Sequence, residues 1–96
     1  LLALDSGFST GSVAGEIIAR VSMEKFNALK SAPARLAMPD VPEPTSPALT
    51  KGFYIRAADV AEKVMGMLGK DTGQVRKDLT EPRPHDIPGK WFTGPF

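Results

Sequence analysis

Asp5 and Glu16 are the carboxylates whose positions could support chemistry. Asp5 ends an apolar run and Glu16 opens a helical segment, so both would lie near the carboxyl end of a parallel strand, where open α/β sheets bind ligands. Either could serve there as a general acid or base. However, no neighbouring titratable group tunes their pKa values, and the spacing of Glu16 and Arg20 favours a surface ion pair. We therefore expect neither carboxylate to be catalytic.

A glycine-bearing turn precedes the helical segment, and it contains Gly11 and Ser12 as candidate anion-binding residues. The free N–H groups and the dipole of a helix N-terminus attract phosphates. The turn nevertheless lacks the lysine of a P-loop and the glycine spacing of a dinucleotide-binding fold. A strand-to-helix turn also needs glycine and a hydroxyl cap for backbone reasons alone. Anion binding is thus the weaker of two alternatives, and a structural turn is the expected one.

The remaining reactive residue types are isolated from one another. The single histidine, His85, lies between Pro84 and Asp86 in a polar segment, where we expect it to be solvated. The serines of the turn have no base nearby in sequence, which disfavours a serine nucleophile. Cysteine is absent, which excludes disulfides, thiolate zinc sites and cysteine nucleophiles. The sequence therefore predicts no catalytic, cofactor-binding or metal-binding residue in this chain.

Charge and composition exclude several classes of partner. Twelve lysine and arginine residues balance eleven aspartate and glutamate residues, for a net charge of +1, which disfavours nucleic acid as a partner. Apolar residues make up 42% and charged residues 24%, as in ordinary globular proteins. The apolar runs fall far short of the ~20 residues that span a bilayer, so we expect no membrane segment. The absence of cysteine fits a reducing compartment, and we expect the cytoplasm, or the mitochondrial matrix in a eukaryote.

Hydrophobic periodicity predicts a βαβα order of elements. A compact apolar run is typical of a buried strand, and the spacing after the turn is that of an amphipathic helix capped by Ser12. Four prolines then indicate a rigid, extended loop, and a second apolar stripe ending at Gly69 indicates another helix. The predicted elements are a strand at Leu1–Asp5, a helix at Ser12–Leu29, a strand at Ala34–Met38, a loop at Pro39–Pro47 and a helix at Ala57–Leu68.

These elements predict an α/β fold with two parallel strands, since a strand, a helix and a strand in this order form a crossover unit. Residues 1–70 would be a truncated three-layer α/β/α domain, and residues 71–96 an irregular tail rich in proline and aromatic residues. A two-stranded sheet cannot cover itself, and Leu1 already lies in the first strand, so we expect a fragment with a thin core. Open sheet edges are commonly covered by pairing. We therefore expect a dimer or a higher oligomer.

Two motifs resemble those of a known family. Gly11–Ile17 (GSVAGEI) is similar to the glycine-rich turn and helix start in the C-terminal domain of the beta subunit of thiamine-diphosphate-dependent 2-oxo acid dehydrogenases. Pro39–Pro44 (PDVPEP), with Leu49 before the last helix, is similar to the proline segment after the next strand in that family. The order of the pieces resembles the branched-chain, pyruvate and acetoin types, and more distantly transketolases. The resemblance covers roughly residues 1–68.

The resemblance implies an assembly role. In the family, thiamine diphosphate and Mg²⁺ are bound between the alpha subunit and the domain preceding this one, so the residues that activate the cofactor would lie outside this chain. The parent enzyme decarboxylates a 2-oxo acid and passes the acyl group to a lipoyl carrier. Its C-terminal domain serves dimer assembly and docking of the acyltransferase core. The alternatives are a domain of a transketolase or another thiamine-diphosphate enzyme, and a stand-alone α/β module that recruits a partner protein.

Exposed apolar side chains are the candidate interface residues. Met23 falls within the polar stripe of the first predicted helix and Phe26 lies at its margin, so both would form an apolar spot on that helix. Trp91, Phe92 and Phe96 lie in the proline-fixed tail, where large aromatic side chains are typical anchors for a partner. The alternative is that they are ordinary exposed apolar residues at a disordered chain end.

Overall fold

The computed structural model describes residues 1–80 and 82–95 and contains the predicted βαβα order. In chain order its elements are β1 (Leu2–Phe8), α1 (Val13–Lys25), the 3₁₀ turn η1 (Phe26–Ala28), β2 (Ala34–Met38), α2 (Pro47–Thr50), α3 (Ala57–Met67) and α4 (Val75–Leu79). The two strands pair in parallel. The prediction of a small α/β fold with parallel strands is therefore confirmed.

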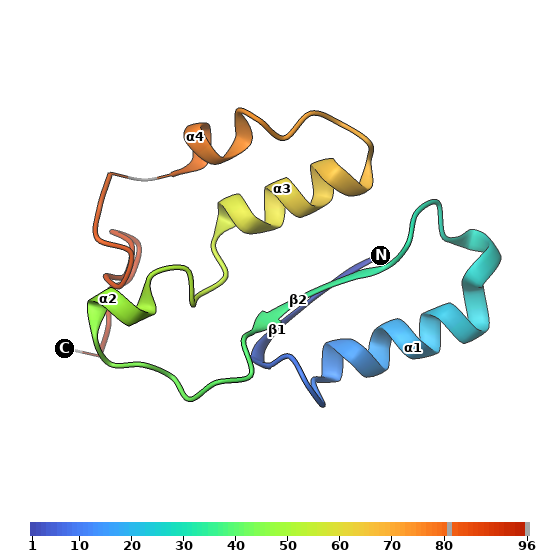
Figure 1. Ribbon diagram of the computed structural model, residues 1–96, viewed down its shortest axis with the longest axis horizontal. Helices are drawn as coiled ribbons and strands as arrows, with labels where there is room; N and C mark the ends of the chain where they lie inside the picture. Colours follow the sequence, from blue (N-terminus) through green and yellow to red (C-terminus); the bar gives the residue numbers. More distant parts are fainter. Residues whose placement is uncertain (81, 96) are drawn as a thin grey trace.

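The sheet lies between two helices. Helix α1 packs against one face, and α3 lies on the other side of β2 (Figure 1). Leu4 pairs with Leu36 and Ala3 with Arg35, so each pair shares a face of the sheet. The guanidinium of Arg35 reaches the start of α1, whereas Leu36 lines a cleft together with residues of α3. Leu4 and Leu36 thus face away from α1, toward the α3 side.

The core is thin, as predicted. Its buried apolar residues are Ala3, Ala14, Phe53 and Ala58, and no large side chain among the described residues is fully buried. Leu4 stays 55% exposed, whereas Leu36, its neighbour on β2, lines the cleft beside α3. The second half of the fold is therefore loosely packed on the first. None of the helices in the described part of the chain is long and apolar enough to cross a bilayer.

Strand β1 continues beyond Asp5, where the prediction had ended it. The Asp5 carboxylate accepts a hydrogen bond from the N–H of Gly7 (2.8 Å), and the pairing is irregular between Leu4 and Phe8. After this bulge Phe8 pairs with Met38, and the N–H of Ser9 donates to the Met38 carbonyl (2.8 Å). The polar residues therefore bend the strand without ending it.

Helix α1 begins as predicted but ends earlier. The hydroxyl of Ser12 accepts a hydrogen bond from the N–H of Gly15 (3.2 Å), which confirms Ser12 as the N-cap. The helix ends at Lys25 and tightens into η1, whereas the prediction ran to Leu29. On its surface Arg20 pairs with Glu24 (3.7 Å), and no ion pair joins Arg20 to Glu16 within the described residues.

The second half has two short helices that the sequence did not predict. Pro47, expected to end the loop, instead occupies the first turn of α2, a position that suits proline because it needs no N–H donor. Helix α4 lies within the segment expected to be irregular, although residues 82–95 contain no regular element, as their prolines predict. Helix α3 matches its predicted range to within one residue and ends before Gly69, whose φ is +67°.

Substitution of Gly11 and of Gly66 by alanine is expected to change the free energy of unfolding in opposite directions. Gly11 has a φ of +73°, which costs a residue with a Cβ about 1–2 kcal/mol, so Gly11→Ala should lower the free energy of unfolding by that amount. Gly66 is helical and a Cβ there meets nothing within 4 Å, so Gly66→Ala should raise it by up to about 1 kcal/mol. Urea denaturation followed by circular dichroism measures both. Shifts of the same sign would contradict the left-handed turn at Gly11.

Candidate functional site

The turn between β1 and α1 is held by the carboxylate of Asp5. Besides the Gly7 N–H, this carboxylate accepts a hydrogen bond from the N–H of Ala14 in the first turn of α1 (3.3 Å). These two backbone bonds, that of Gly7 first, hold the pKa of Asp5 below its ordinary value. Asp5 is therefore an ionised capping group. Because its oxygens are engaged by the backbone, the geometry favours a structural role over proton transfer.

The candidate anion-binding residues Gly11 and Ser12 lie in the same turn. The N–H of Ala14 is already bonded to Asp5, and that of Gly15 to the Ser12 hydroxyl. An incoming anion would have to compete with these internal acceptors and with the charge of Asp5. The arrangement thus supports the structural reading of the turn.

Asp40 ties the segment after β2 to this turn. Its two carboxylate oxygens accept hydrogen bonds from the hydroxyl of Thr10 (2.6 Å) and from the Thr10 N–H (2.8 Å). The hydroxyl bond, followed by the backbone bond, lowers the pKa of Asp40. Arg35 lies near both carboxylates and donates to the Ser12 hydroxyl (3.3 Å). Thr10, the residue directly before the Gly11–Ile17 motif, is therefore bonded to Asp40 of the Pro39–Pro44 motif at the carboxyl end of the sheet.

The groups at this junction, which we call the joint, hold the backbone in place. It brings together two ionised carboxylates, one guanidinium and hydroxyl groups that already hold hydrogen-bond partners. Within residues 1–80 and 82–95, no group of three histidine, cysteine or acidic residues could hold a metal ion. What the junction does is fix the start of α1 and the proline segment relative to the sheet.

Four of the five candidate interface residues are strongly exposed. Met23 and Phe26 are 77% and 70% exposed near the end of α1, and Trp91 and Phe92 are 79% and 51% exposed in the tail. Phe96 lies outside the described residues. The end of α1 and the tail lie at opposite ends of the molecule (Figure 1), so these residues form two separate apolar spots and not one surface.

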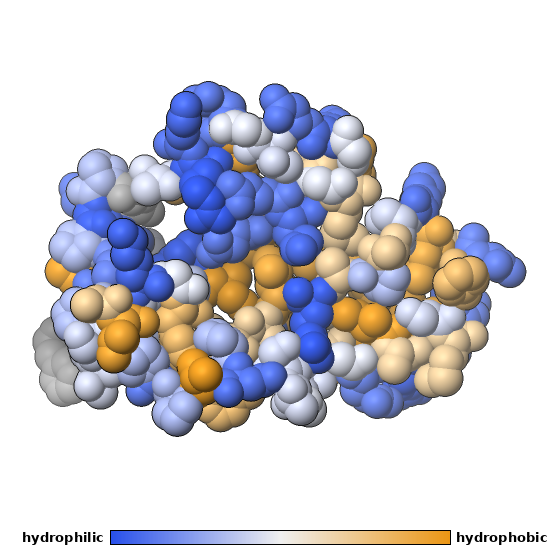
Figure 2. All heavy atoms as spheres, viewed as in Figure 1, coloured by the Kyte–Doolittle hydropathy of each residue, from blue (hydrophilic) through white to orange (hydrophobic). Residues whose placement is uncertain are grey.

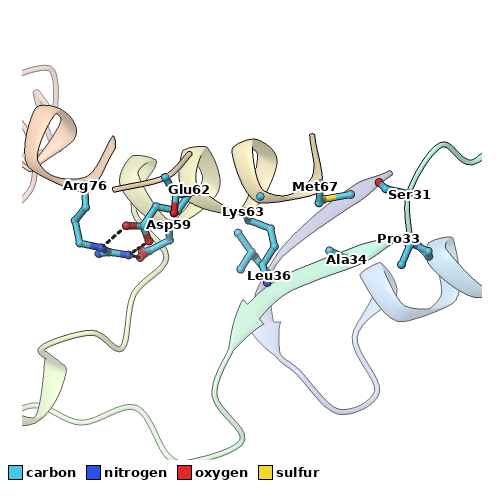
Figure 3. Close-up of a pocket in the computed structure, with 12 residues that line it drawn as sticks. Ser31, Pro33, Ala34, Leu36, Asp59, Glu62, Lys63, Met67 and Arg76 are labelled. Atoms are coloured by element: carbon cyan, nitrogen blue, oxygen red, sulfur yellow. Dashed lines mark hydrogen bonds and ion pairs between the residues drawn. The ribbon is translucent and has the colours of Figure 1, made fainter. Parts of the chain in front are cut away.

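A cleft of about 730 Å³ separates β2 from α3. We call it the sheet cleft; its lining includes Ala34, Leu36, Asp59, Lys63, Gly66 and Met67. Figure 3 shows Lys63 reaching from α3 toward Leu36, and Met67 lying opposite the segment before β2. In the space-filling view, apolar side chains remain visible at the centre of the molecule below the hydrophilic surface of α3 and α4 (Figure 2). The inner face of α3 is therefore incompletely covered.

Arg76 fastens α4 to α3 at the end of the sheet cleft. Its guanidinium donates to the carboxylates of Glu62 (2.9 Å from Nε) and Asp59 (2.8 Å from Nη2), as Figure 3 shows. Glu62 first and then Asp59 raise the pKa of Arg76 further above its already high value. All three side chains are partly exposed, so solvent screens the pairing. Its main role is geometric, because it gives a five-residue helix a fixed place.

A second cleft, of about 620 Å³, lies between the start of α3 and the tail. We call it the basic cleft, and its lining includes Lys51, Tyr54, Arg56, Arg83, His85 and Trp91. The tail is held here by His85, whose Nε2 lies 2.9 Å from the buried hydroxyl of Thr50. The Thr50 hydroxyl also donates to the Pro47 carbonyl (3.1 Å), so this threonine links the tail to the first turn of α2. His85 is thus half-buried and bonded, where solvation was expected.

Sequence reasoning missed the basic cleft because its residues come from three separate segments. Lys51 and Arg56 are near each other in sequence and could have signalled a basic spot, but Arg83 and Trp91 join them only through the folded tail. Comparisons of the chain with models of protein families, with curated proteins and with solved structures found no match.

Proposed function

We propose that this chain acts as the C-terminal assembly domain of the beta subunit of a thiamine-diphosphate-dependent 2-oxo acid dehydrogenase, and that it is not catalytic alone. The two motifs behind this proposal are adjacent in the structure, because Thr10, directly before the first motif, bonds Asp40 of the second. The two motifs thus follow the order seen in the family along the sequence, and they are also neighbours in the fold. This supports a shared fold unit more than two separate chance similarities would.

The observation that carries the assembly role is the large exposed surface. A compact protein of this mass exposes about 5,400 Å², whereas this chain exposes 7379 Å². The difference exceeds the roughly 800 Å² that each partner contributes to an ordinary stable interface. The radius of gyration is 15.6 Å, against about 12–13 Å for a compact domain of this length. A partner that covers this surface would supply the packing that the thin core lacks.

A partner chain would add the most hydrogen bonds at the outer edge of β1. Among the described residues only β2 pairs with β1, so the other edge of this strand presents unpaired backbone groups. Leu4 lies on the same strand and is 55% exposed, which adds an apolar contact beside the free edge. Self-association through this edge extends the sheet and places a side chain of the partner strand beside Leu4 on the same face.

The cofactor and the other partners belong to the proposed parent enzyme. The described residues offer no cluster of acidic or histidine side chains for Mg²⁺, so this chain does not fit the metal, and no step of the decarboxylation is placed in it. Thiamine diphosphate would be bound by the preceding domain and the alpha subunit. The acyltransferase core would dock on the assembled enzyme, in the cytoplasm or the mitochondrial matrix.

The isolated chain is expected to sediment as a dimer or a higher oligomer at about 100 μM. Leu4→Lys places a charge beside the open edge and should weaken association about tenfold or more, because a leucine contact is worth about 1.5–3 kcal/mol. The matched control is Val41→Lys, at a residue that is 50% exposed in the proline segment. Circular dichroism checks that both variants fold. A wild-type monomer at this concentration would contradict self-association.

The reading frame upstream of Leu1 tests the family assignment separately. A 2-oxo acid dehydrogenase requires a thiamine-diphosphate-binding domain there, and a transketolase would be recognised by its own cofactor domain. A start codon at Leu1 without such a domain would overturn the assignment in favour of a stand-alone interaction module. The exposed Trp91 and Phe92 favour that second candidate, since both are available to a partner.

A further inference from the structure

The basic cleft combines a suitable size with an unusual lining. Its volume of about 620 Å³ falls within the range of roughly 300–1,000 Å³ that is typical of small-molecule sites. The cleft is formed by the turn after α2, the start of α3, α4 and the tail. Its walls therefore come from segments that are brought together only in the folded chain. This feature is independent of the β1 edge that the proposed assembly uses.

The charges lining the cleft favour an anion. Among the described residues, four cationic side chains line it, those of Lys51, Arg56, Arg76 and Arg83, against one carboxylate, that of Asp59. Asp59 and Arg76 neutralise each other through their ion pair. Lys51 and Arg56 form no ion pair within the described residues. An anion entering the cleft thus finds two cationic groups that no carboxylate of the described chain engages.

Aromatic rings lie beside these charges. The hydroxyl of Tyr54 donates to Glu43 (2.6 Å), which anchors the ring, and the guanidinium of Arg56 lies 5.9 Å from the ring centroid. Trp91 lies over Gly89, where any Cβ would collide with the indole. The Trp91 indole can therefore occupy this position only because residue 89 has no side chain. Flat rings in the lining of a basic cleft are suited to a planar ligand.

We propose that the basic cleft binds a small ligand that combines a planar ring with a phosphate or carboxylate group. Arg56 and Lys51 contact the anionic group, because their charges are the ones without a carboxylate partner. Trp91 covers the ring from the tail side. Since the tail closes one wall of the cleft through His85 and Thr50, ligand binding and tail docking favour each other.

Trp91 is the only tryptophan of the chain, so its emission reports on the cleft alone. Titration with adenosine monophosphate should give a saturable change in emission at low ionic strength, weaker at 0.5 M salt because screening reduces charge contacts. Adenosine, which has the ring without the anion, and inorganic phosphate, which has the anion without the ring, should each bind about tenfold more weakly or not at all. Amide shifts of Lys51 and Arg56 in NMR spectra provide a second measurement.

Arg56→Gln should weaken binding of adenosine monophosphate about tenfold, as expected for loss of one charge-assisted contact. The matched control is Arg20→Gln on α1, which removes the same charge far from the cleft and should leave binding unchanged. Circular dichroism checks the fold of both variants. Equal weakening by the two substitutions, equal binding of adenosine, or no change in emission or amide shifts at 10 mM nucleotide would each overturn the proposal.

Discussion

Phe53→Ala is expected to lower the free energy of unfolding by about 3 kcal/mol, and the thermal midpoint by about 10–20 °C. Phe53 is 8% exposed and is the one large apolar side chain that the structure buries in residues 1–80 and 82–95. It packs edge-to-face on Tyr54 with ring centroids 5.3 Å apart. A domain of this size has only about 5–14 kcal/mol of stability in total. Loss of this ring should therefore remove a large part of it.

Urea denaturation of the wild type and of Phe26→Ala provides the comparison. The control removes the same ring from a position that is 70% exposed, so its effect should stay within about 0.5–1 kcal/mol. Equal losses for the two variants would show that the core does not centre on Phe53.

The sequence predicted those features that depend on local rules. Ser12 starts α1 because its hydroxyl can bond the backbone three residues later, and Gly69 ends α3 because it adopts a positive φ. Strand β2 was predicted at its observed range because a short, mostly apolar run lies between a turn and Pro39. In each case the signal and the structure lie within a few residues of each other.

The features that the sequence did not predict depend on contacts between distant residues. Helix α4 has five residues, too few for a stable isolated helix, and it is fixed by the ion pairs of Arg76 with α3. His85 lies 35 residues from Thr50, so a proline-rich segment gave no sign of its docking. The prediction of a solvated histidine failed for this reason. The basic cleft forms only when the tail docks in this way, so the sequence did not predict it either.

The joint at the end of the sheet was predicted only in part. Asp5 was identified as a notable carboxylate at the end of a strand, but its role as a cap appears only when α1 packs back on β1. Asp40 was recognised as part of a motif, whereas its bonds to Thr10 join residues 30 positions apart. The sequence thus located the residues of the joint, and the tertiary structure determined what each of them does.

The joint should make the stability of the domain sensitive to acid. Backbone and hydroxyl donors hold the pKa values of Asp5 and Asp40 below the ordinary value of 3.8. A carboxyl group whose pKa is lower in the folded state stabilises the fold fully above its unfolded pKa, and this stability is lost as the pH falls through the folded pKa. The contribution of Asp5 and Asp40 to the thermal midpoint should therefore be constant between about pH 7 and 5 and decrease below about pH 4.

The double variant Asp5→Asn/Asp40→Asn separates this effect from general acid unfolding. Its amides accept hydrogen bonds more weakly than carboxylates, so its midpoint should be several degrees lower at pH 7. It should also depend less on pH below 4, because the two groups that bind protons on unfolding are gone. Asp86→Asn is the control, since Asp86 accepts no hydrogen bond within the described residues. Calorimetry between pH 2 and 7 measures the thermal midpoints of all three proteins. If the midpoint of the double variant falls in acid as steeply as that of the wild type, Asp5 and Asp40 do not cause the acid sensitivity of this fold.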